Sequence, residues 1–457
     1  MLKFYNSRSK QVEIFNHGTE PINIYTCGPT VYDYVHLGNL KTFIWSDFII
    51  VFLQKLGYQT KHIINITDID DKIISRLPKQ THESLLNYTN FFTDNFYSDM
   101  VKMGITSYGE QNIHKVTDNV DHIETMIEFF LETKKAYKSK DGTIYFDTTT
   151  IVNNPFIPII DTSEYNSGRE IIRSDDIRNK NDFVLWKIKD NEEIKFGKKL
   201  QKGRCGWHIE CSAIADKHLG KVHIKMGGCD LKFPHHSSEI AQSEAFSGQI
   251  YGDYWIHMNF LNINGEKISK SEGNVIRLSE TTHNHKLLRM YLLSKSYRRL
   301  FEYNDEEIVL LKKNFINLHL LYNKLSKKFY KVFKDEKNEK SEKNEIYQNI
   351  LDVLKNDFDT ENAYAKLISY VDLMMKKKMN DNLAIYVLNE LEKVNSLFNI
   401  IDKDLLDIDE AALILIAEKE KERELKNFQK SDKIRKDLSG KYFIEDDSSG
   451  LTLIKRF

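Results

Sequence analysis

Residues 22 to 56 limit the possible folds of this chain more than any other stretch, because a strand, a turn and a helix follow one another there. The β-branched run from Ile22 to Thr26 predicts a strand, and Gly28 marks the turn after it. Apolar residues at helical spacing predict a helix over residues 42 to 56. The start of such a helix attracts phosphate, because its N–H groups and its dipole both favour negative charge.

Further elements place this unit in a larger sheet. We expect strands over residues 60–67, 222–224 and 254–264, helices over 82–104, 116–135 and 234–247, and a hairpin over 136–148. Polar residues 68 to 72 follow a strand, at the end where open α/β sheets bind ligands. Residues 149 to 200 lack periodicity, which indicates an insertion between two halves of the sheet.

The character of the chain changes after about residue 285. Helical periodicity without glycine predicts a bundle from helices over residues 304–333, 345–356, 360–376 and 381–400. Residues 334 to 345 are a charged connector. A charged helix from 409 to about 438 precedes strand-like pieces at 442–444 and 451–454.

The predicted fold is a Rossmann-type parallel sheet with an insertion, followed by an α-helical bundle and a small α+β C-terminal domain. The expected domains are a sheet domain in two halves (1–115 and 206–257), a connective insertion (116–205), a linker (258–303), the bundle (304–402) and a small C-terminal domain (403–457).

Composition sets outer limits on function. The chain has 457 residues, a net charge of -1 and 41% hydrophobic residues, which indicates a globular protein without a general basic excess. No apolar run reaches signal-peptide or membrane-span length, so we expect a cytoplasmic protein without a membrane partner. Four cysteines are too few for a disulfide scaffold and are buried thiols or metal ligands.

Two short motifs suit phosphate chemistry. His36, Gly38 and Asn39 precede the first long helix, and Lys267 and Lys270 lie in a glycine-flanked loop after the last predicted sheet strand. Alone, the first motif is also compatible with a capping or surface histidine, and the second with a solvated loop. Together they resemble the signature pair of class I aminoacyl-tRNA synthetases. A helix start with an imidazole can bind an α-phosphate, and two mobile lysines can hold the departing phosphates.

Four other residues could hold a metal. Cys27 ends the first strand, Cys211 lies further along, and His235 and Glu239 are one helical turn apart. Two thiolates, an imidazole and a carboxylate are plausible tetrahedral zinc ligands. The competing candidates are Cys205, Cys229, His208 and His236, and buried thiols beside a helix histidine are the simpler alternative.

Blocks along the whole chain resemble cysteinyl-tRNA synthetase. They are CGPTVYD (27–33), HLGN (36–39), NITDIDDK (65–72), FVLWK (183–187), GWHIECS (206–212), FPHH (233–236) and the RxxKxFxxSDxIR block (423–435). The resemblance implies that Cys27, Cys211, His235 and Glu239 hold one zinc whose open position takes the thiolate of cysteine. It implies His36, Asn39, Lys267 and Lys270 in catalysis, and Gly38 and Trp207 at the adenylate. Thr67 would line that pocket and Asp230 would face the substrate ammonium group.

The implied reaction joins L-cysteine to its tRNA, with ATP and magnesium, in a monomer. The resemblance implies that residues 1–115 and 206–257 are the catalytic domain and that residues 403–457 are an anticodon-binding domain. Zinc would select cysteine over serine, because it prefers a soft thiolate to a neutral hydroxyl. The family usually has other residues at Cys205, Lys225, Met226, Ser237 and Ser238, which puts the surroundings of the zinc in question. The alternatives are a paralogue that passes cysteine to a small amine and an inactive RNA-binding relative.

Overall fold

The computed structural model describes most of the chain. The described residues are 1–151, 176–189, 192–268, 273–329, 345–402, 414–415, 418–419, 422–423, 425–438, 442–446 and 452–456. The chain forms two compact units, the first comprising Met1–Thr282, Lys295–Tyr303 and Lys355–Phe358. The second comprises His283–Ser294, Asn304–Leu354 and Asp359–Phe457.

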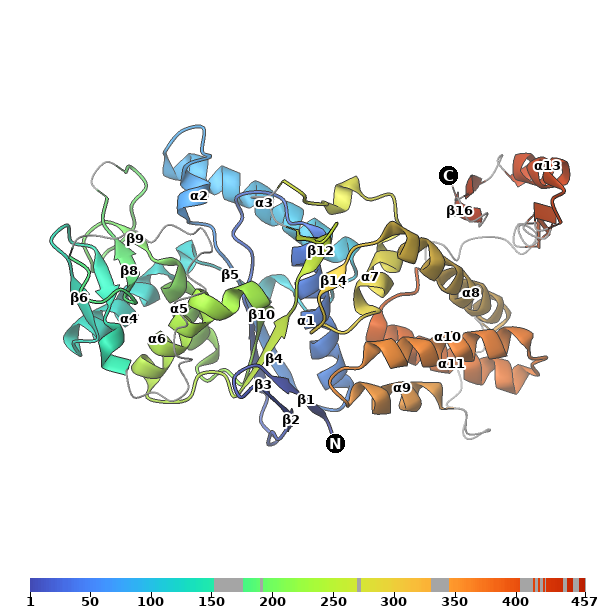
Figure 1. The fold of residues 1–457 in the computed structure, drawn as a ribbon, viewed down its shortest axis with the longest axis horizontal. Helices are drawn as coiled ribbons and strands as arrows, with labels where there is room; N and C mark the ends of the chain where they lie inside the picture. The colour runs from blue at the N-terminus through green and yellow to red at the C-terminus, as the bar shows by residue number, and fades with distance from the viewer. Residues whose placement is uncertain are drawn as a thin grey trace. The chain divides into compact units, whose positions relative to one another are not determined.

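A five-stranded parallel sheet organises the first unit (Figure 1). Its strands are β3 (Ile22–Thr26), β4 (Thr60–Ile66), β5 (Ile113–Lys115), β10 (Ile224–Gly228) and β11 (Tyr254–Met258). They lie in the order β11-β10-β3-β4-β5, in which Ile24 pairs with both Ile224 and His62. This is the doubly wound order, and its direction reverses between β3 and β10, where such folds bind ligands.

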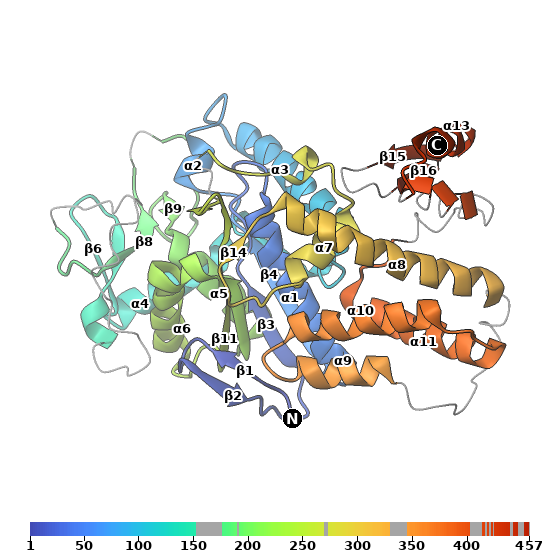
Figure 2. The same cartoon turned by 45° about the vertical axis from the view of Figure 1, so that its right-hand side comes forward.

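Helices cover both faces of this sheet (Figures 1 and 2). One face packs against α1 (Leu37–Lys55), and the other against α5 (Trp207–Leu219), which contacts α4 (Val120–Glu132) and α6 (Ser237–Ser247). Most of α1 is buried, which explains why apolar residues occur almost all round it. The connection from β4 to β5 contains α2 (Asp71–Ile74) and α3 (His82–Lys102).

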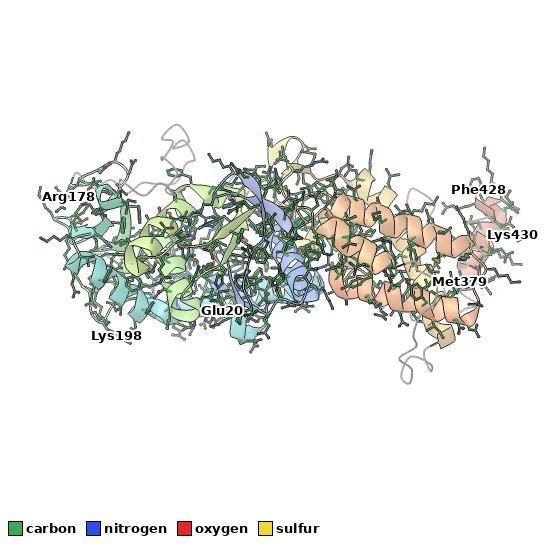
Figure 3. All side chains as sticks on the ribbon, turned by 90° about the horizontal axis from the view of Figure 1, so that it is seen from below. Glu20, Arg178, Lys198, Met379, Phe428 and Lys430 are labelled. Atoms are coloured by element: carbon green, nitrogen blue, oxygen red, sulfur yellow. The ribbon has the colours of Figure 1, made fainter. Side chains whose placement is uncertain are left out.

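An antiparallel sheet forms within the chain segment that joins β5 to β10. Its strands, in order, are β6 (Ala136–Lys138), β7 (Ile144–Phe146), β8 (Phe183–Lys187) and β9 (Arg204–Cys205). The exposed Arg178 and Lys198 belong to this segment (Figure 3). Arg178 lies 4.1 Å from the ring centre of Tyr137, and the Lys198 ammonium lies 3.0 Å from a carboxylate oxygen of Asp121.

Smaller elements complete the first unit. A hairpin of β1 (Lys3–Asn6) and β2 (Gln11–Ile14) begins the chain, and β12 (Leu261–Ile263) pairs with β13 (Glu266–Lys267) and β14 (Phe301–Glu302). The short helical turns are η1 (Glu110–Asn112), η2 (Thr117–Asn119), η3 (Thr148–Ile151), η5 (Cys229–Leu231), η6 (Lys232–His236) and η7 (Leu278–Glu280).

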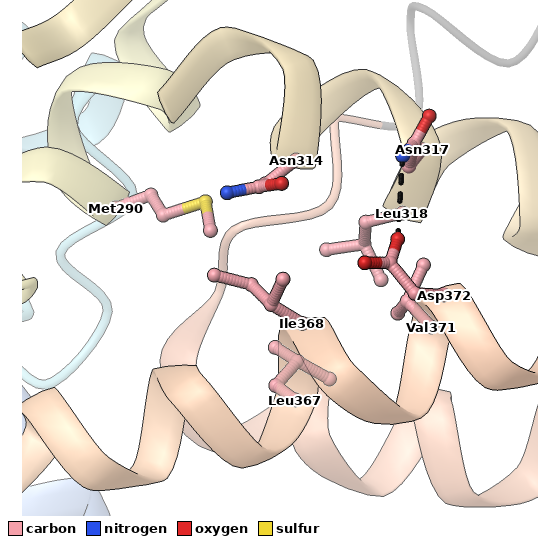
Figure 4. Close-up of a pocket in the computed structure, with 8 residues that line it drawn as sticks. All are labelled: Met290, Asn314, Asn317, Leu318, Leu367, Ile368, Val371 and Asp372. Atoms are coloured by element: carbon pink, nitrogen blue, oxygen red, sulfur yellow. Dashed lines mark hydrogen bonds between the residues drawn. The ribbon is translucent and has the colours of Figure 1, made fainter. Parts of the chain in front are cut away.

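The second unit is mainly helical. It contains α7 (His285–Leu293), α8 (Asp305–Phe329), α9 (Ile346–Leu354), α10 (Thr360–Lys376), α11 (Asp381–Phe398), α13 (Phe428–Leu438) and the antiparallel pair β15 (Tyr442–Asp446) and β16 (Thr452–Arg456). Side chains of α7, α8 and α10 line a recess of about 10 Å³ (Figure 4). That volume holds at most one water, so the recess is a packing gap and too small for a substrate.

The predicted fold class is confirmed, with local corrections. The helix predicted from residue 42 begins at Leu37, and the strand predicted over 222–224 spans Ile224–Gly228. The single strand predicted over 254–264 is divided into β11 and β12. Residues 334 to 344 of the predicted connector lie outside the described residues. Across the described parts of the chain, no helix combines the length and apolarity needed to cross a membrane.

Candidate metal and nucleotide site

The candidate site lies at the carboxyl ends of the central strands. Cys27 directly follows β3, and the next residue, Gly28, donates its backbone N–H to Asn65 Oδ1 at 2.9 Å. A Cβ built on Gly28 would lie 1.6 Å from the Asn65 carbonyl oxygen. Only glycine allows β3 and β4 to approach so closely here, and this approach fixes the backbone that carries Cys27.

Helix α5 brings two further site residues to the same place. It begins after Gly206, whose N–H donates to the Leu185 carbonyl of β8 at 2.8 Å. A Cβ on Gly206 would lie 2.0 Å from the Val184 carbonyl oxygen. The inserted sheet therefore supports the start of α5, with Trp207 in its first turn and Cys211 one turn later.

Cys27, Cys211, His235 and Glu239 form a compact buried cluster, and their ligand atoms all lie within 4.8 Å of one another. The two Sγ atoms are 3.9 Å apart, and His235 Nε2 lies 3.1 Å from Glu239 Oε1. Usual zinc bond lengths in a tetrahedron give about 3.8 Å between two sulfurs and about 3.3 Å between nitrogen and oxygen. The four donors thus fit a tetrahedral zinc ion in both chemistry and spacing.

The electrostatics of the cluster favour charged ligands. Burial alone would raise the pKa of the Cys27 thiol, but the hydrogen bond from Cys211 and the nearby Lys225 charge hold it well below its usual range. Burial and the neighbouring Cys27 raise the pKa of Cys211. Burial lowers the pKa of His235, yet the charges of Cys27 and Glu239 outweigh it and raise that pKa to about 9. The lowered pKa of Cys27 favours its thiolate form, and a bound cation would favour loss of the proton from Cys211.

The competing ligand candidates have other partners. Cys205 donates to Glu210 Oε1 at 3.5 Å, and Cys229 to Asn259 Oδ1 at 3.4 Å. His208 Nδ1 lies 3.1 Å from Nδ1 of His235, so it contacts a cluster residue from outside.

His236 is nearer to the donors. Its Nε2 lies 3.3 Å from Cys27 Sγ and 3.9 Å from Glu239 Oε1, while its Nδ1 lies 2.8 Å from His257 Nε2. The group of four residues whose ligand atoms all lie within 4.8 Å of one another contains His235 and not His236, so His236 lies next to this group.

The HLGN motif caps α1. His36 Nδ1 accepts from the Asn39 N–H at 3.2 Å, and Asn39 Oδ1 accepts from the His36 N–H at 3.3 Å. A capping histidine was one of the two interpretations of the sequence, and this bonding leaves the phosphate interpretation open. A Cβ on Gly38 would lie 3.8 Å from Cβ of Ile268, so the two signature motifs are neighbours. Lys270 lies outside the described residues.

The remaining predicted residues have well-defined partners, and one of them, Trp207, contacts the cluster directly. Trp207 stacks on His235 with ring centres 4.3 Å apart, and the buried Thr67 donates to Glu210 Oε2 at 3.0 Å. Asp230 Oδ2 lies 3.2 Å from Lys267 Nζ.

Ser237 and Ser238, which depart from the family pattern, both donate to the Pro234 carbonyl, at 2.9 and 2.7 Å. Each hydroxyl thus satisfies a backbone acceptor at the start of α6.

The sequence did not predict the contacts of three polar residues that the structure places at the site, although Lys225 is among the departures from the family pattern. Lys225 and Tyr251 both contact Glu239 Oε2, and the buried Glu210 accepts from Thr67 and Cys205. Burial and the negative charge of Asp70 raise the pKa of Glu210 well above its usual range. The one available signal for such a buried pair was Lys225, a lysine directly after the predicted strand over residues 222–224.

Three comparisons with known proteins bear on this site. The model of the family described as "tRNA synthetases class I (C) catalytic domain" matches residues 14–313. A "Cysteine--tRNA ligase" of Methanococcus maripaludis strain C7 is 34% identical over 100% of this chain and 99% of its own length. One of Geobacillus sp. strain WCH70 is 32% identical over the same shares.

A solved structure of Mycobacterium tuberculosis methionyl-tRNA synthetase in complex with methionyl-adenylate covers 86% of each chain, with a TM-score of 0.51. Its identity of 14% supports the fold alone. Because the family model spans well over half of the chain and the first two relatives align along its whole length, the chain belongs to the class I (C) tRNA synthetases.

Proposed function

We propose that this chain attaches L-cysteine to its cognate tRNA by way of cysteinyl-adenylate. A carboxylate oxygen of cysteine attacks the α-phosphate of ATP and releases pyrophosphate. A hydroxyl of the 3′-terminal adenosine then attacks the carbonyl carbon and releases AMP. The observation that carries the proposal is the buried group of Cys27, Cys211, His235 and Glu239 next to the switch point of the sheet.

The four donors would hold one zinc ion. Such an ion supplies a soft Lewis acid that favours a thiolate over a neutral hydroxyl. A pocket that recognises shape alone discriminates between similar substrates by only about 10- to 200-fold. A metal that binds the thiolate would add chemical discrimination between cysteine and serine. The ligand distances and the lowered Cys27 pKa support this assignment.

The nucleotide would lie at the start of α1. His36, Gly38 and Asn39 form its first turn, where backbone N–H groups favour a phosphate. Trp207 offers a half-buried ring for the adenylate, and Thr67 a buried hydroxyl. Lys267 and Lys270 would hold the pyrophosphate together with magnesium.

Asp230 would bind the ammonium group of cysteine. Asp230 lies in η5, the turn that directly follows β10, and its carboxylate already accepts an ammonium group, that of Lys267, at 3.2 Å. The substrate would therefore displace Lys267, which frees that lysine for the phosphates.

A local basic surface would bind the tRNA, because the net charge of the chain is -1. Helix α13 exposes Lys433, Arg435 and Lys436, and the exposed Phe428 and Lys430 stand in its first turn (Figure 3). Phosphate contacts of this kind weaken as salt rises. Affinity for tRNA that is equal at low and high salt would contradict this part of the proposal.

A two-step assay tests the reaction. Cysteine-dependent exchange of pyrophosphate into ATP reports adenylate formation, and radiolabelled cysteine on tRNA reports transfer. Absence of exchange would refute the proposed activity and favour an inactive relative. Exchange without tRNA charging would favour a ligase that passes cysteine to a small amine.

A further inference from the structure

Lys225 is a lysine in the middle of the central sheet. It lies in β10, paired with Tyr25 of β3 and Trp255 of β11, and it is 0% exposed. Its ammonium group lies 3.8 Å from the centre of the Tyr25 ring. An ammonium group is rarely buried so completely unless a charged partner accompanies it.

That partner is Glu239, one of the four donors of the cluster. Lys225 Nζ lies 2.6 Å from Glu239 Oε2, and both side chains are 0% exposed. The Tyr251 hydroxyl donates to the same oxygen at 3.0 Å. The other oxygen, Oε1, lies 3.1 Å from His235 Nε2 and 3.4 Å from Cys27 Sγ. The two carboxylate oxygens of Glu239 thus have different partners. Oε2 is bound by Lys225 and Tyr251, and Oε1 faces His235 and Cys27.

The charges of the four donors, the zinc ion and Lys225 also support a pairing of Lys225 with Glu239. Two thiolates and a carboxylate carry three negative charges, of which a zinc dication would offset two. The Lys225 ammonium offsets the third inside a site that solvent does not reach. Uncompensated charge in such a place is costly.

We propose that Lys225 is a positioning residue for the zinc site, because it fixes Glu239 so that one oxygen faces the metal and neutralises the remaining charge. The inference rests on the proposed function only in that zinc is the ion. It assigns Lys225 no contact with cysteine, ATP or tRNA.

The test replaces Lys225 by methionine, which has a similar length and no charge. Zinc affinity is measured on the full chain by competition with a chelator, without amino acid or tRNA. Loss of a residue that orients a metal ligand costs about 10- to 100-fold in metal affinity, and we expect K225M to fall in that range. The visible spectrum of the cobalt-loaded protein should also shift, because Glu239 would no longer be held to one orientation.

Lys41→Met is the matched control. Lys41 is another buried lysine of the first unit, 1% exposed, and it donates to the Asn259 carbonyl at 2.7 Å, away from the four donors. K41M should keep the zinc affinity and cobalt spectrum of the wild type. Wild-type affinity in K225M, or an equal loss in K41M, would overturn the inference.

A second variant covers the case in which K225M does not fold. Tyr251→Phe keeps the ring and Lys225 but removes one hydrogen bond to Glu239 Oε2. That loss should weaken zinc binding by about 3- to 10-fold, and an unchanged affinity would overturn the inference. In active variants, the KM for cysteine should rise more than the KM for ATP.

The proposed function can fail separately. A wild-type chain that binds zinc but does not charge tRNA would refute the reaction and leave the role of Lys225 standing. A wild-type chain that binds no zinc would refute the metal site and this inference together.

Discussion

Substitution of Gly28 by alanine tests how the closest approach in the central sheet shapes the site. Gly28 lacks the positive φ that favours glycine, so space alone excludes a side chain. A Cβ there would lie 1.6 Å from the Asn65 carbonyl oxygen, whereas ordinary contacts begin at 3.4 Å. Either β3 or β4 must therefore move by about 1.8 Å.

This displacement has a cost in stability and a cost in metal binding. Overpacking of a core costs about 1–3 kcal/mol, and the upper end applies because the obstacle is backbone. A loss of about 3 kcal/mol corresponds to a fall in Tm of roughly 5 °C, because the first unit has about 300 residues and the entropy of unfolding is about 2.1 cal/mol/K per residue. Cys27 is the adjacent residue, and a shift of its sulfur by more than 1 Å exceeds the tolerance of about 0.2 Å in a zinc bond.

Thermal unfolding and zinc stoichiometry measure the two effects on the same samples. Gly18→Ala is the control, since a Cβ on Gly18 meets nothing within 4 Å and its φ is also not positive. We expect G28A to unfold earlier and to retain less zinc than G18A. Equal Tm values and full zinc occupancy in both variants would refute the steric argument.

Three further predictions concern the cluster, an ion pair and a helix cap. Cys211→Ser should deplete zinc and raise the KM for cysteine by at least about 10-fold, and retained stoichiometric zinc would identify Cys205 or Cys229 as the ligand. Asp71 is partly buried, but Lys187 and Arg204 outweigh that burial and hold its pKa well below the usual range. D71N should therefore lower the free energy of unfolding by about 1–2 kcal/mol at pH 7, after allowance for the exposed part of the pair. That difference should shrink as pH falls below the unfolded-state pKa of about 3.9, so urea titrations with an equal difference at pH 7 and pH 3 would contradict it. Asp359 accepts from the Asn362 N–H at 3.0 Å at the start of α10, and D359A should cost about 1 kcal/mol in urea unfolding, with D359N nearer to the wild type.

The elements with a strong local pattern were predictable from sequence. The strand over residues 22–26 coincides with β3 because β-branched residues of a buried parallel strand form a continuous run. The bundle helices agree closely with prediction, since each buries one face and the pattern of apolar residues repeats every turn.

Elements that depend on distant partners were not predictable. β10 ends in Gly227 and Gly228, which have no strand preference, and their pairing with His257 and Met258 of β11 makes them part of the strand. Helix α5 begins within the sequence GWHIEC and is buried on nearly every side. It therefore has no amphipathic pattern from which a helix could be predicted. The start of α1 was missed because the side chains of His36 and Asn39 cap it.

The site was predictable as a set of residue types and not as an arrangement. Spacing alone paired only His235 with Glu239, and the remaining ligand choices came from resemblance. The role of Lys225 depends on a neighbour fourteen residues away in sequence and on two tyrosine rings. Such a contact exists only after the sheet and α6 have packed together.

The parallel pairing of β3 with β10 also has a consequence for the synthesis of this protein on the ribosome. Cys27 and Glu239 meet across 212 residues of sequence, and at about 5–20 residues per second their synthesis is separated by roughly 10–40 s. For most of that interval Cys27 belongs to a nascent chain whose other three donors do not yet exist. The Cys27 thiol must remain reduced until the other donors have been synthesised. The yield of active protein should therefore depend on the redox state of the compartment during translation.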